Sequence, residues 1–117
     1  MRNFNINEFD SPDLKGSGAK MNSCFLEMLD NARDIAGIPF AINSGYRTLE
    51  QNSKVGGVNS SSHTKGLAVD IACNDSRARF LIVSALKEAG FTRIGISDSF
   101  IHVDSDSDKA QDVIWTY

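Results

Sequence analysis

Two histidines, His63 and His102, and one aspartate, Asp70, lie in or beside apolar runs of the kind that form strands. Two neutral imidazoles and one carboxylate are ligands that zinc accepts when it keeps a fourth position open for water. A single histidine in such a setting is more often an ordinary surface or core residue. Here both histidines of the chain occur together with small intervening residues, so the sequence predicts a catalytic zinc site at these three side chains.

The first strand that would position this site covers residues 67–73, a run of β-branched and small apolar residues. Side chains alternate between the two faces of a strand, so Asp70 would share a face with Ala68 and Ala72. Such small neighbours leave space for a metal and a substrate. Gly66, just before the strand residues, permits the tight turn that would bring the preceding histidine to face the aspartate.

A second strand over residues 100–104 would present His102 on the face opposite Ile101 and Val103. Three further short strands are expected, at residues 40–42, 93–96 and 113–115. Helices are expected where apolar residues recur at three- and four-residue spacing between capping residues. Their expected bounds are Asn22 or Ser23 to Gly37, Asp75 or Ser76 to Gly90, and a brief segment after Thr48. This uneven mixture predicts an α+β fold with two main helices packed on a largely antiparallel sheet.

The zinc pattern resembles that of a known family, the LAS-type peptidoglycan peptidases. The motif Ser61-x-His63-x-x-Gly66-x-Ala68-x-Asp70, followed by a histidine on a strand, is similar to the zinc signature of D-alanyl-D-alanine carboxypeptidases and L-alanyl-D-glutamate endopeptidases, which include phage endolysins. The upstream segment Ser44-Gly45-Tyr46-Arg47-Thr48 is similar to the Ser-x-Tyr-Arg segment of that family. The resemblance covers roughly residues 38–104.

This resemblance implies the fold of hedgehog-type and D-alanyl-D-alanine peptidase domains, with Zn2+ as the cofactor. It also implies that Arg47 stabilises a developing oxyanion or binds a substrate carboxylate. Ser44, Tyr46 and Ser61 would bind the substrate. The implied substrates are peptidoglycan stem peptides that contain D-amino acids.

The chain departs from the family at the general base, which the family places three residues before the second histidine. Ser99 occupies that position, and serine cannot act as that base. The neighbouring Asp98 lies in a short turn between serines and is the first candidate for the proton shuttle. Asp104 would share a face with His102 and could instead orient that imidazole.

Two functions remain open on these observations. The intact ligands and Arg47 favour a zinc peptidase that cuts peptides containing D-amino acids in bacterial cell walls. The serine at the base position favours a catalytically impaired, zinc-containing module that binds the cell wall, for example as part of a phage virion.

The composition predicts one domain over residues 1–117, with a modest hydrophobic core. The formal net charge of -3 gives no basic surface for nucleic acid. No stretch reaches the ~20 apolar residues that a membrane span needs, and the first residues lack the apolar core of a secretory signal. We therefore expect a monomer that is made in the cytoplasm and acts on the cell wall if it is released.

Residues 1–20 are polar and rich in turn residues, so we expect them to wrap the surface with Phe4, Ile6 and Phe9 as anchors. Cys24 and Cys73 are expected to be buried free thiols, and a disulfide between them is the open alternative.

The acidic run Asp104-x-Asp106-x-Asp108 resembles the start of a calcium-binding loop. Lys109 replaces the glycine of such a loop and Trp115 replaces its final glutamate. The run is therefore expected to be a solvated acidic turn.

Overall fold

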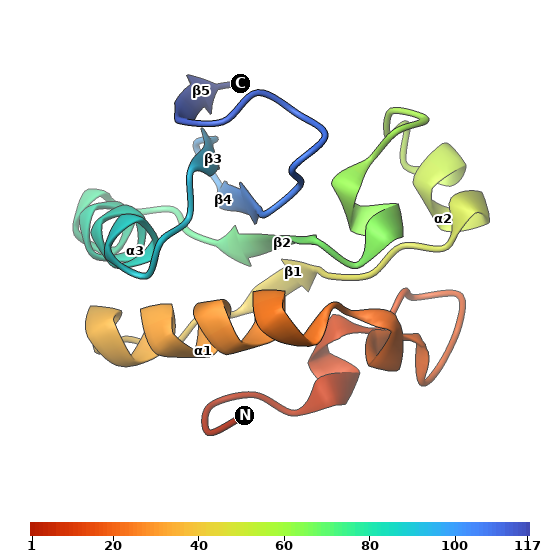
Figure 1. The fold of residues 1–117 in the computed structure, drawn as a ribbon, viewed down its shortest axis with the longest axis horizontal. Coiled ribbons are helices and arrows are strands. Elements are labelled where there is room, and N and C mark those ends of the chain that lie inside the picture. Colours follow the sequence, from red (N-terminus) through yellow and green to blue (C-terminus); the bar gives the residue numbers. More distant parts are fainter.

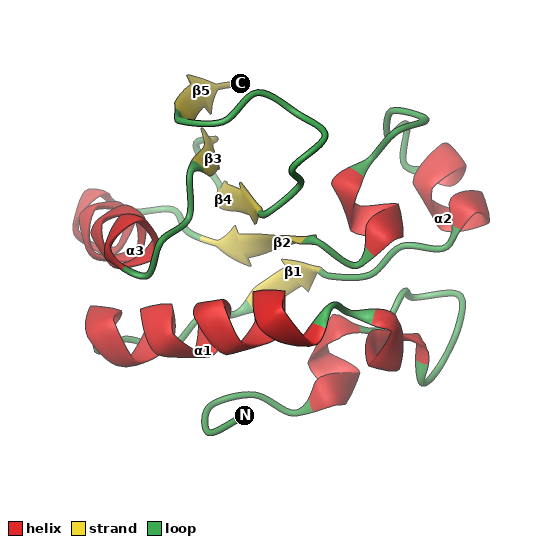
Figure 2. Cartoon of the chain, viewed as in Figure 1, coloured by secondary structure: helices red, strands yellow, loops and turns green.

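A five-stranded sheet organises the computed structural model, which describes residues 1–117 (Figures 1 and 2). The order of its strands is β1-β2-β4-β3-β5. Their bounds are Ile42–Ser44 for β1, Ala68–Ala72 for β2, Arg93–Ile96 for β3, Phe100–Asp104 for β4 and Val113–Thr116 for β5. The pairs β1–β2, β2–β4 and β4–β3 are antiparallel, and only β5 pairs in parallel, with β3. The expected α+β fold with a largely antiparallel sheet is confirmed.

The two faces of the sheet differ in chemistry because side chains alternate along each strand. Val69 of β2, with Ile101 and Val103 of β4, is fully buried in one hydrophobic core that also takes side chains from the two long helices. Asp70 and His102 alternate with these residues and therefore lie on the opposite face. One face of the sheet thus builds the core, and the other is available for a site.

Two long helices cover the core face, and a short one follows β1. Their bounds are Ser23–Ala36 for α1, Leu49–Lys54 for α2 and Ser76–Glu88 for α3. Each begins at a side chain that accepts a hydrogen bond from a backbone N–H three residues later, namely Asn22, Thr48 and Asp75. Gly37 ends α1 in the left-handed conformation, with φ +69°. The capping residues in the sequence therefore predicted all three helix starts.

The N-terminal segment lies against α1 and contains two short 3-10 helices, η1 (Ile6–Phe9) and η2 (Ser17–Lys20) (Figure 1). Phe4 and Phe9 are buried, with ring centroids 5.4 Å apart. Ile6 is exposed, so the expectation that it anchors the segment is wrong. The backbone N–H groups of Arg2 and Asn3 donate to the buried carboxylate of Asp30 on α1, at 2.9 and 3.0 Å.

Burial alone would raise the pKa of Asp30, but these backbone hydrogen bonds outweigh it and hold that pKa below its usual range. The ionised carboxylate therefore stabilises the attachment of the N-terminal segment to α1.

Two sequence expectations need adjustment. The strand expected at residues 40–42 is displaced to β1, and Phe40 instead lies buried before it. Both cysteines are free thiols as expected, but Cys24 is exposed and only Cys73 is buried.

None of the helices has both the length and the apolar character that a membrane crossing requires.

Candidate metal centre

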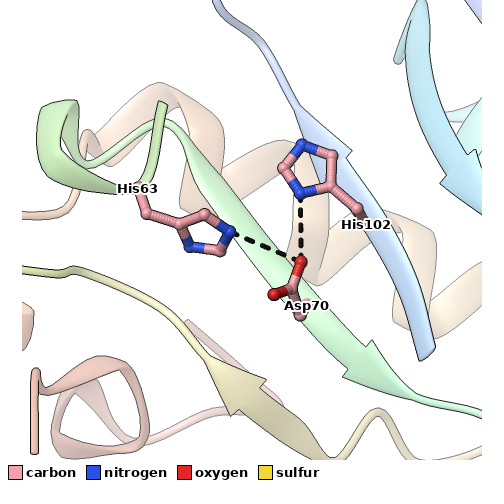
Figure 3. Close-up of side chains that lie close together, drawn as sticks. All are labelled: His63, Asp70 and His102. Carbon is pink, nitrogen blue, oxygen red and sulfur yellow. Dashed lines mark hydrogen bonds and ion pairs between the residues drawn. The ribbon is translucent and has the colours of Figure 1, made fainter. Parts of the chain in front are cut away.

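Three segments of the chain bring the predicted ligands together (Figure 3). His63 lies on η3 (Ser62–Lys65), a 3-10 turn that leads into β2, while Asp70 lies on β2 and His102 on β4. Asp70 and His102 are direct cross-strand partners in the antiparallel pair. The sequence predicted this arrangement, in which a histidine on a turn faces an aspartate and a histidine on two strands.

The turn that carries His63 depends on two small residues. Ser61 Oγ accepts a hydrogen bond from the backbone N–H of His63 at 3.3 Å, which caps η3. Gly66 ends η3 with φ +71°, a conformation that favours glycine. A Cβ at Gly66 would also lie 2.5 Å from the carbonyl oxygen of Lys20, so the backbone contact excludes any larger residue. The predicted role of this glycine in turning the chain is therefore supported by its conformation.

The three side chains converge on one point between them. Asp70 Oδ1 lies 3.0 Å from His102 Nδ1 and 3.4 Å from His63 Nε2 (Figure 3). One ligand atom from each residue lies within 4.8 Å of the others. Two imidazole nitrogens and a carboxylate oxygen at such spacing match the donor set of a zinc site with an open position.

The remaining ring nitrogens have partners that fix the two imidazoles. His63 Nδ1 is 2.8 Å from the carbonyl oxygen of Gly45, which can only accept, so this nitrogen carries a proton. His102 Nε2 is 2.7 Å from Asp104 Oδ2 and donates to that carboxylate. In the neutral rings the lone pairs are then on the two nitrogens that face Asp70. This arrangement of supporting hydrogen bonds is typical of metal-binding histidines.

Electrostatics favour an ionised Asp70. Burial alone would raise its pKa, but the adjacent imidazoles of His102 and His63 hold the pKa of Asp70 well below its usual range. Burial likewise opposes protonation of His102, yet its hydrogen bonds to Asp104 and Asp70 raise the pKa of this imidazole. The ionised Asp70 carboxylate thus places a negative charge beside the two imidazoles, where a cation would bind.

The acidic run after β4 is not a solvated turn, so that expectation is wrong. Asp104 and Asp106 are both buried. Asp104 Oδ1 accepts from Arg93 Nε at 2.8 Å, and Asp106 Oδ2 accepts from Lys65 Nζ at 2.9 Å. Ser62 Oγ also donates to Asp106, at 2.7 Å. The run therefore connects β4 to the turn that carries the first histidine.

The ligands line a cavity of about 430 Å³. Its other lining residues come from the loops on either side of α2, from the start of η3, from β3, β4 and β5, and from the segments that flank β5. They are Arg47, Gly56, Gly57, Val58, Ser61, Ser62, Arg93, Phe100, Asp104, Lys109, Trp115 and Tyr117.

Arg47 reaches this cavity and is held there by side chains on three sides. Its Nε donates to Ser44 Oγ at 3.1 Å, and its Nη1 donates to Asn52 Oδ1 at 3.3 Å. Nη2 lies 3.5 Å from Asp70 Oδ2. The structure therefore places the predicted arginine beside the proposed ligands. Ser44 contacts Arg47 and does not line the cavity.

The other sequence-predicted residues are divided between the cavity and its surroundings. Ser61 lines the cavity. Tyr46 does not, since its ring lies under Lys20 Nζ, 5.7 Å from the ring centroid, and packs against the core. Asp98 is exposed in the turn between β3 and β4, where it accepts a hydrogen bond from Ser97. It is absent from the lining, whose carboxylates are Asp70 and Asp104.

One row of cross-strand partners runs through the site. Its members, in the order of the strands, are Ser44, Asp70, His102, Gly95 and Trp115. The Trp115 ring lies over Gly95, and a Cβ on that glycine would come within 2.7 Å of the ring. Trp115 on β5 and Tyr117, which directly follows this strand, thus form an aromatic wall of the cavity. No motif in the sequence indicated this wall, because the pairing of β5 with β3 joins distant segments.

The sequence model of the Peptidase M15 family matches residues 3–104 of the chain, which include all three proposed ligands and Arg47. No curated protein matches the chain. The match covers most of the 117 residues, and it agrees with the donor set and the α+β architecture described above. The chain therefore belongs to the M15 family of zinc peptidases.

Proposed function

We propose that the protein is a zinc peptidase that hydrolyses peptidoglycan peptide bonds involving D-amino acids. The observation that carries this proposal is the pair of imidazoles whose supporting hydrogen bonds leave His63 Nε2 and His102 Nδ1 free to bind a metal beside Asp70. The cavity around them has the volume for a peptide segment of a few residues, because ligand pockets typically measure about 300–1,000 Å³.

His63, Asp70 and His102 would hold a zinc ion with an open coordination position, which would supply an activated water at neutral pH and polarise a scissile carbonyl. The protein residues would position the substrate around that centre. Arg47 would stabilise the negative charge that develops on the carbonyl oxygen, since its guanidinium is fixed by Ser44 and Asn52. Asp104 would keep the His102 ring in place by accepting its Nε2–H.

Release of new amino groups from purified peptidoglycan tests this function directly. The zinc-loaded parent should release them, and a His63→Ala, His102→Ala double variant should not. Mass spectrometry of the products would then separate a carboxypeptidase, which releases one terminal D-amino acid, from an endopeptidase, which divides the stem peptide. Zinc-loaded protein that releases no amino groups from any peptidoglycan tested would contradict the proposal.

A second candidate, a zinc-containing module that binds the cell wall without cutting it, is favoured by one observation. Both carboxylates of the cavity are engaged, Asp70 with the histidines and Asp104 with His102 and Arg93. Ser99, at the position where the family resemblance places the base, is exposed. Sedimentation of the protein with peptidoglycan in the absence of amino-group release would establish this second function.

A further inference from the structure

Lys109 contributes a cation to the wall of the metal cavity. It follows the part of the chain that the family model matches, which ends at residue 104. Its Nζ donates to Ser62 Oγ at 2.9 Å, and Ser62 directly precedes the proposed ligand His63. The ammonium group is therefore held beside the metal centre, and its side chain is 25% exposed, so a molecule in the cavity can reach it.

The charge of Lys109 is only partly balanced by its acidic neighbour. Asp106 Oδ2 lies 3.8 Å from Lys109 Nζ, which is beyond hydrogen-bond distance. The same carboxylate oxygen is 2.9 Å from Lys65 Nζ and also accepts from Ser62. An ammonium group has three N–H donors, and for Lys109 only the donor to Ser62 has a partner in the protein. Lys109 therefore has hydrogen-bonding capacity left for a bound molecule.

The other two cationic side chains of the cavity, Arg93 and Arg47, have more contacts with protein groups than Lys109 has. Arg93 donates to the carboxylate of Asp104 and to the carbonyl of Ala110, and its guanidinium lies 4.9 Å from the Trp115 ring centroid. Arg47 contacts Ser44, Asn52 and the proposed ligand Asp70, and the proposed function already assigns it to the developing oxyanion. If Arg47 binds the developing oxyanion, a carboxylate of the substrate would therefore bind Lys109, which has N–H donors without a partner in the protein.

We propose that Lys109 is a specificity residue that selects peptides with a free carboxylate close to the scissile bond. This inference rests on the proposed peptidase function, whose substrate class it narrows. Three cationic side chains line the cavity against two carboxylates, and both carboxylates already bind partners in the protein. An ammonium group binds a carboxylate more strongly than it binds a neutral amide, so amidation of that carboxylate should weaken recognition.

Matched peptide pairs test this selection. One pair is acyl-D-alanyl-D-alanine with its terminal carboxylate free or amidated, and the other is acyl-L-alanyl-D-glutamate with its α-carboxylate free or amidated. Dissociation constants measured by calorimetry on the zinc-loaded protein, together with kcat/KM for any peptide that is cut, give the acid-to-amide preference. We expect Lys109→Gln to reduce this preference about 10-fold or more, the scale of one hydrogen bond to a charged group.

Lys65 offers a matched control because it pairs with the same Asp106 carboxylate but does not line the cavity. Lys65→Gln should keep the preference of the parent, as should Lys109→Arg, which retains the charge. Zinc content and circular dichroism would show that each variant is folded. A measurement on the parent alone is also informative, since its acid-to-amide preference should weaken as salt is raised.

The outcomes separate the two proposals. An unchanged preference in folded Lys109→Gln, or no preference by the parent in either pair, overturns the role of Lys109. Acid-selective binding that is lost in Lys109→Gln without any hydrolysis would support Lys109 and contradict the peptidase function. If Lys109→Gln does not fold, a preference of the parent that is insensitive to salt would overturn the proposal.

Discussion

His102 lies directly opposite Asp70 on the neighbouring antiparallel strand, and its Nδ1 is 3.0 Å from Asp70 Oδ1. The register of β2 against β4 therefore sets the spacing of two of the three proposed ligands. Because both residues are on paired strands, only His63 on its short turn needs to be positioned separately.

We expect one zinc ion per chain and its loss in variants that lack the histidines. His63→Ala and His102→Ala each remove one of two imidazole ligands, and the double variant leaves only a carboxylate, which is a weak zinc ligand on its own. Elemental analysis after dialysis provides the measurement. Full zinc retention in the double variant would show that the metal binds elsewhere.

Replacing Asp104 by asparagine should weaken zinc binding without removing a ligand. The variant loses the charged acceptor of the His102 Nε2–H, and such supporting groups typically contribute about 10–100-fold to metal affinity. Competition with a chelator measures the change. Asp98→Asn is the control, because Asp98 is exposed and outside the cavity, and an effect of similar size there would contradict the assignment.

Arg47→Ala should retain zinc but lose turnover. Loss of a single oxyanion donor typically costs about 10²-fold or more in kcat. Peptide hydrolysis and elemental analysis on the same preparation separate the two effects. Activity equal to that of the parent would mean that Arg47 only supports the loop through Ser44 and Asn52.

Acid should destabilise the parent more than an Asp30→Asn variant. The pKa of Asp30 is lowered in the folded state, so its contribution is complete above the unfolded pKa of about 3.9 and is lost as the pH falls through the folded value. At pH 7 the variant should be less stable by about 1–2 kcal/mol, because an ionised acceptor of two backbone N–H groups is gone.

Urea unfolding between about pH 5 and about pH 2 checks this prediction, since the two stability curves should converge at the acid end. Asp98→Asn again serves as the control and should follow the parent. Parallel curves for the parent and Asp30→Asn would show that the carboxylate does not hold the N-terminal segment in the expected way.

Gly95→Ala should disturb the aromatic wall. The new Cβ would lie 2.7 Å from the Trp115 ring, so the ring must move, and overpacking of this kind typically costs about 1–3 kcal/mol. Trp115 is the only tryptophan, so its fluorescence reports the change directly. Thr116→Ala, at an exposed neighbouring position, should leave the emission unchanged. Identical spectra for the parent and Gly95→Ala would contradict the described packing.

The sequence predicted the parts of the site that depend on local chemistry. The alternation of side chains around Asp70 and His102 assigned both residues to one face, and the capping residues gave the helix starts. Arg47 was found through its motif, and its contacts with Ser44 and Asn52 place it at the cavity. These features were predictable because they depend on residues that are close in sequence.

Features that depend on distant partners could not be predicted in this way. The sequence predicted that Asp106 lies in a solvated acidic turn. It is buried instead, because Ser62 and Lys65, more than 40 residues earlier, supply its hydrogen bonds. Trp115 enters the cavity only because β5 pairs in parallel with β3. Asp98 directly precedes Ser99, the position at which the family resemblance places the base. The tight turn between two strands nevertheless leaves Asp98 exposed and outside the cavity.

Along β4, residues that pack in the hydrophobic core alternate with residues that line the cavity. Ile101 and Val103 belong wholly to the core, whereas Phe100 and His102 line the cavity, although the four residues are contiguous. A substitution at a cavity position can therefore alter which molecules fit without opening a void beneath the sheet. Because the residues after 104 supply further parts of the wall, a family of variants with different substrate ranges could be built on one unchanged core.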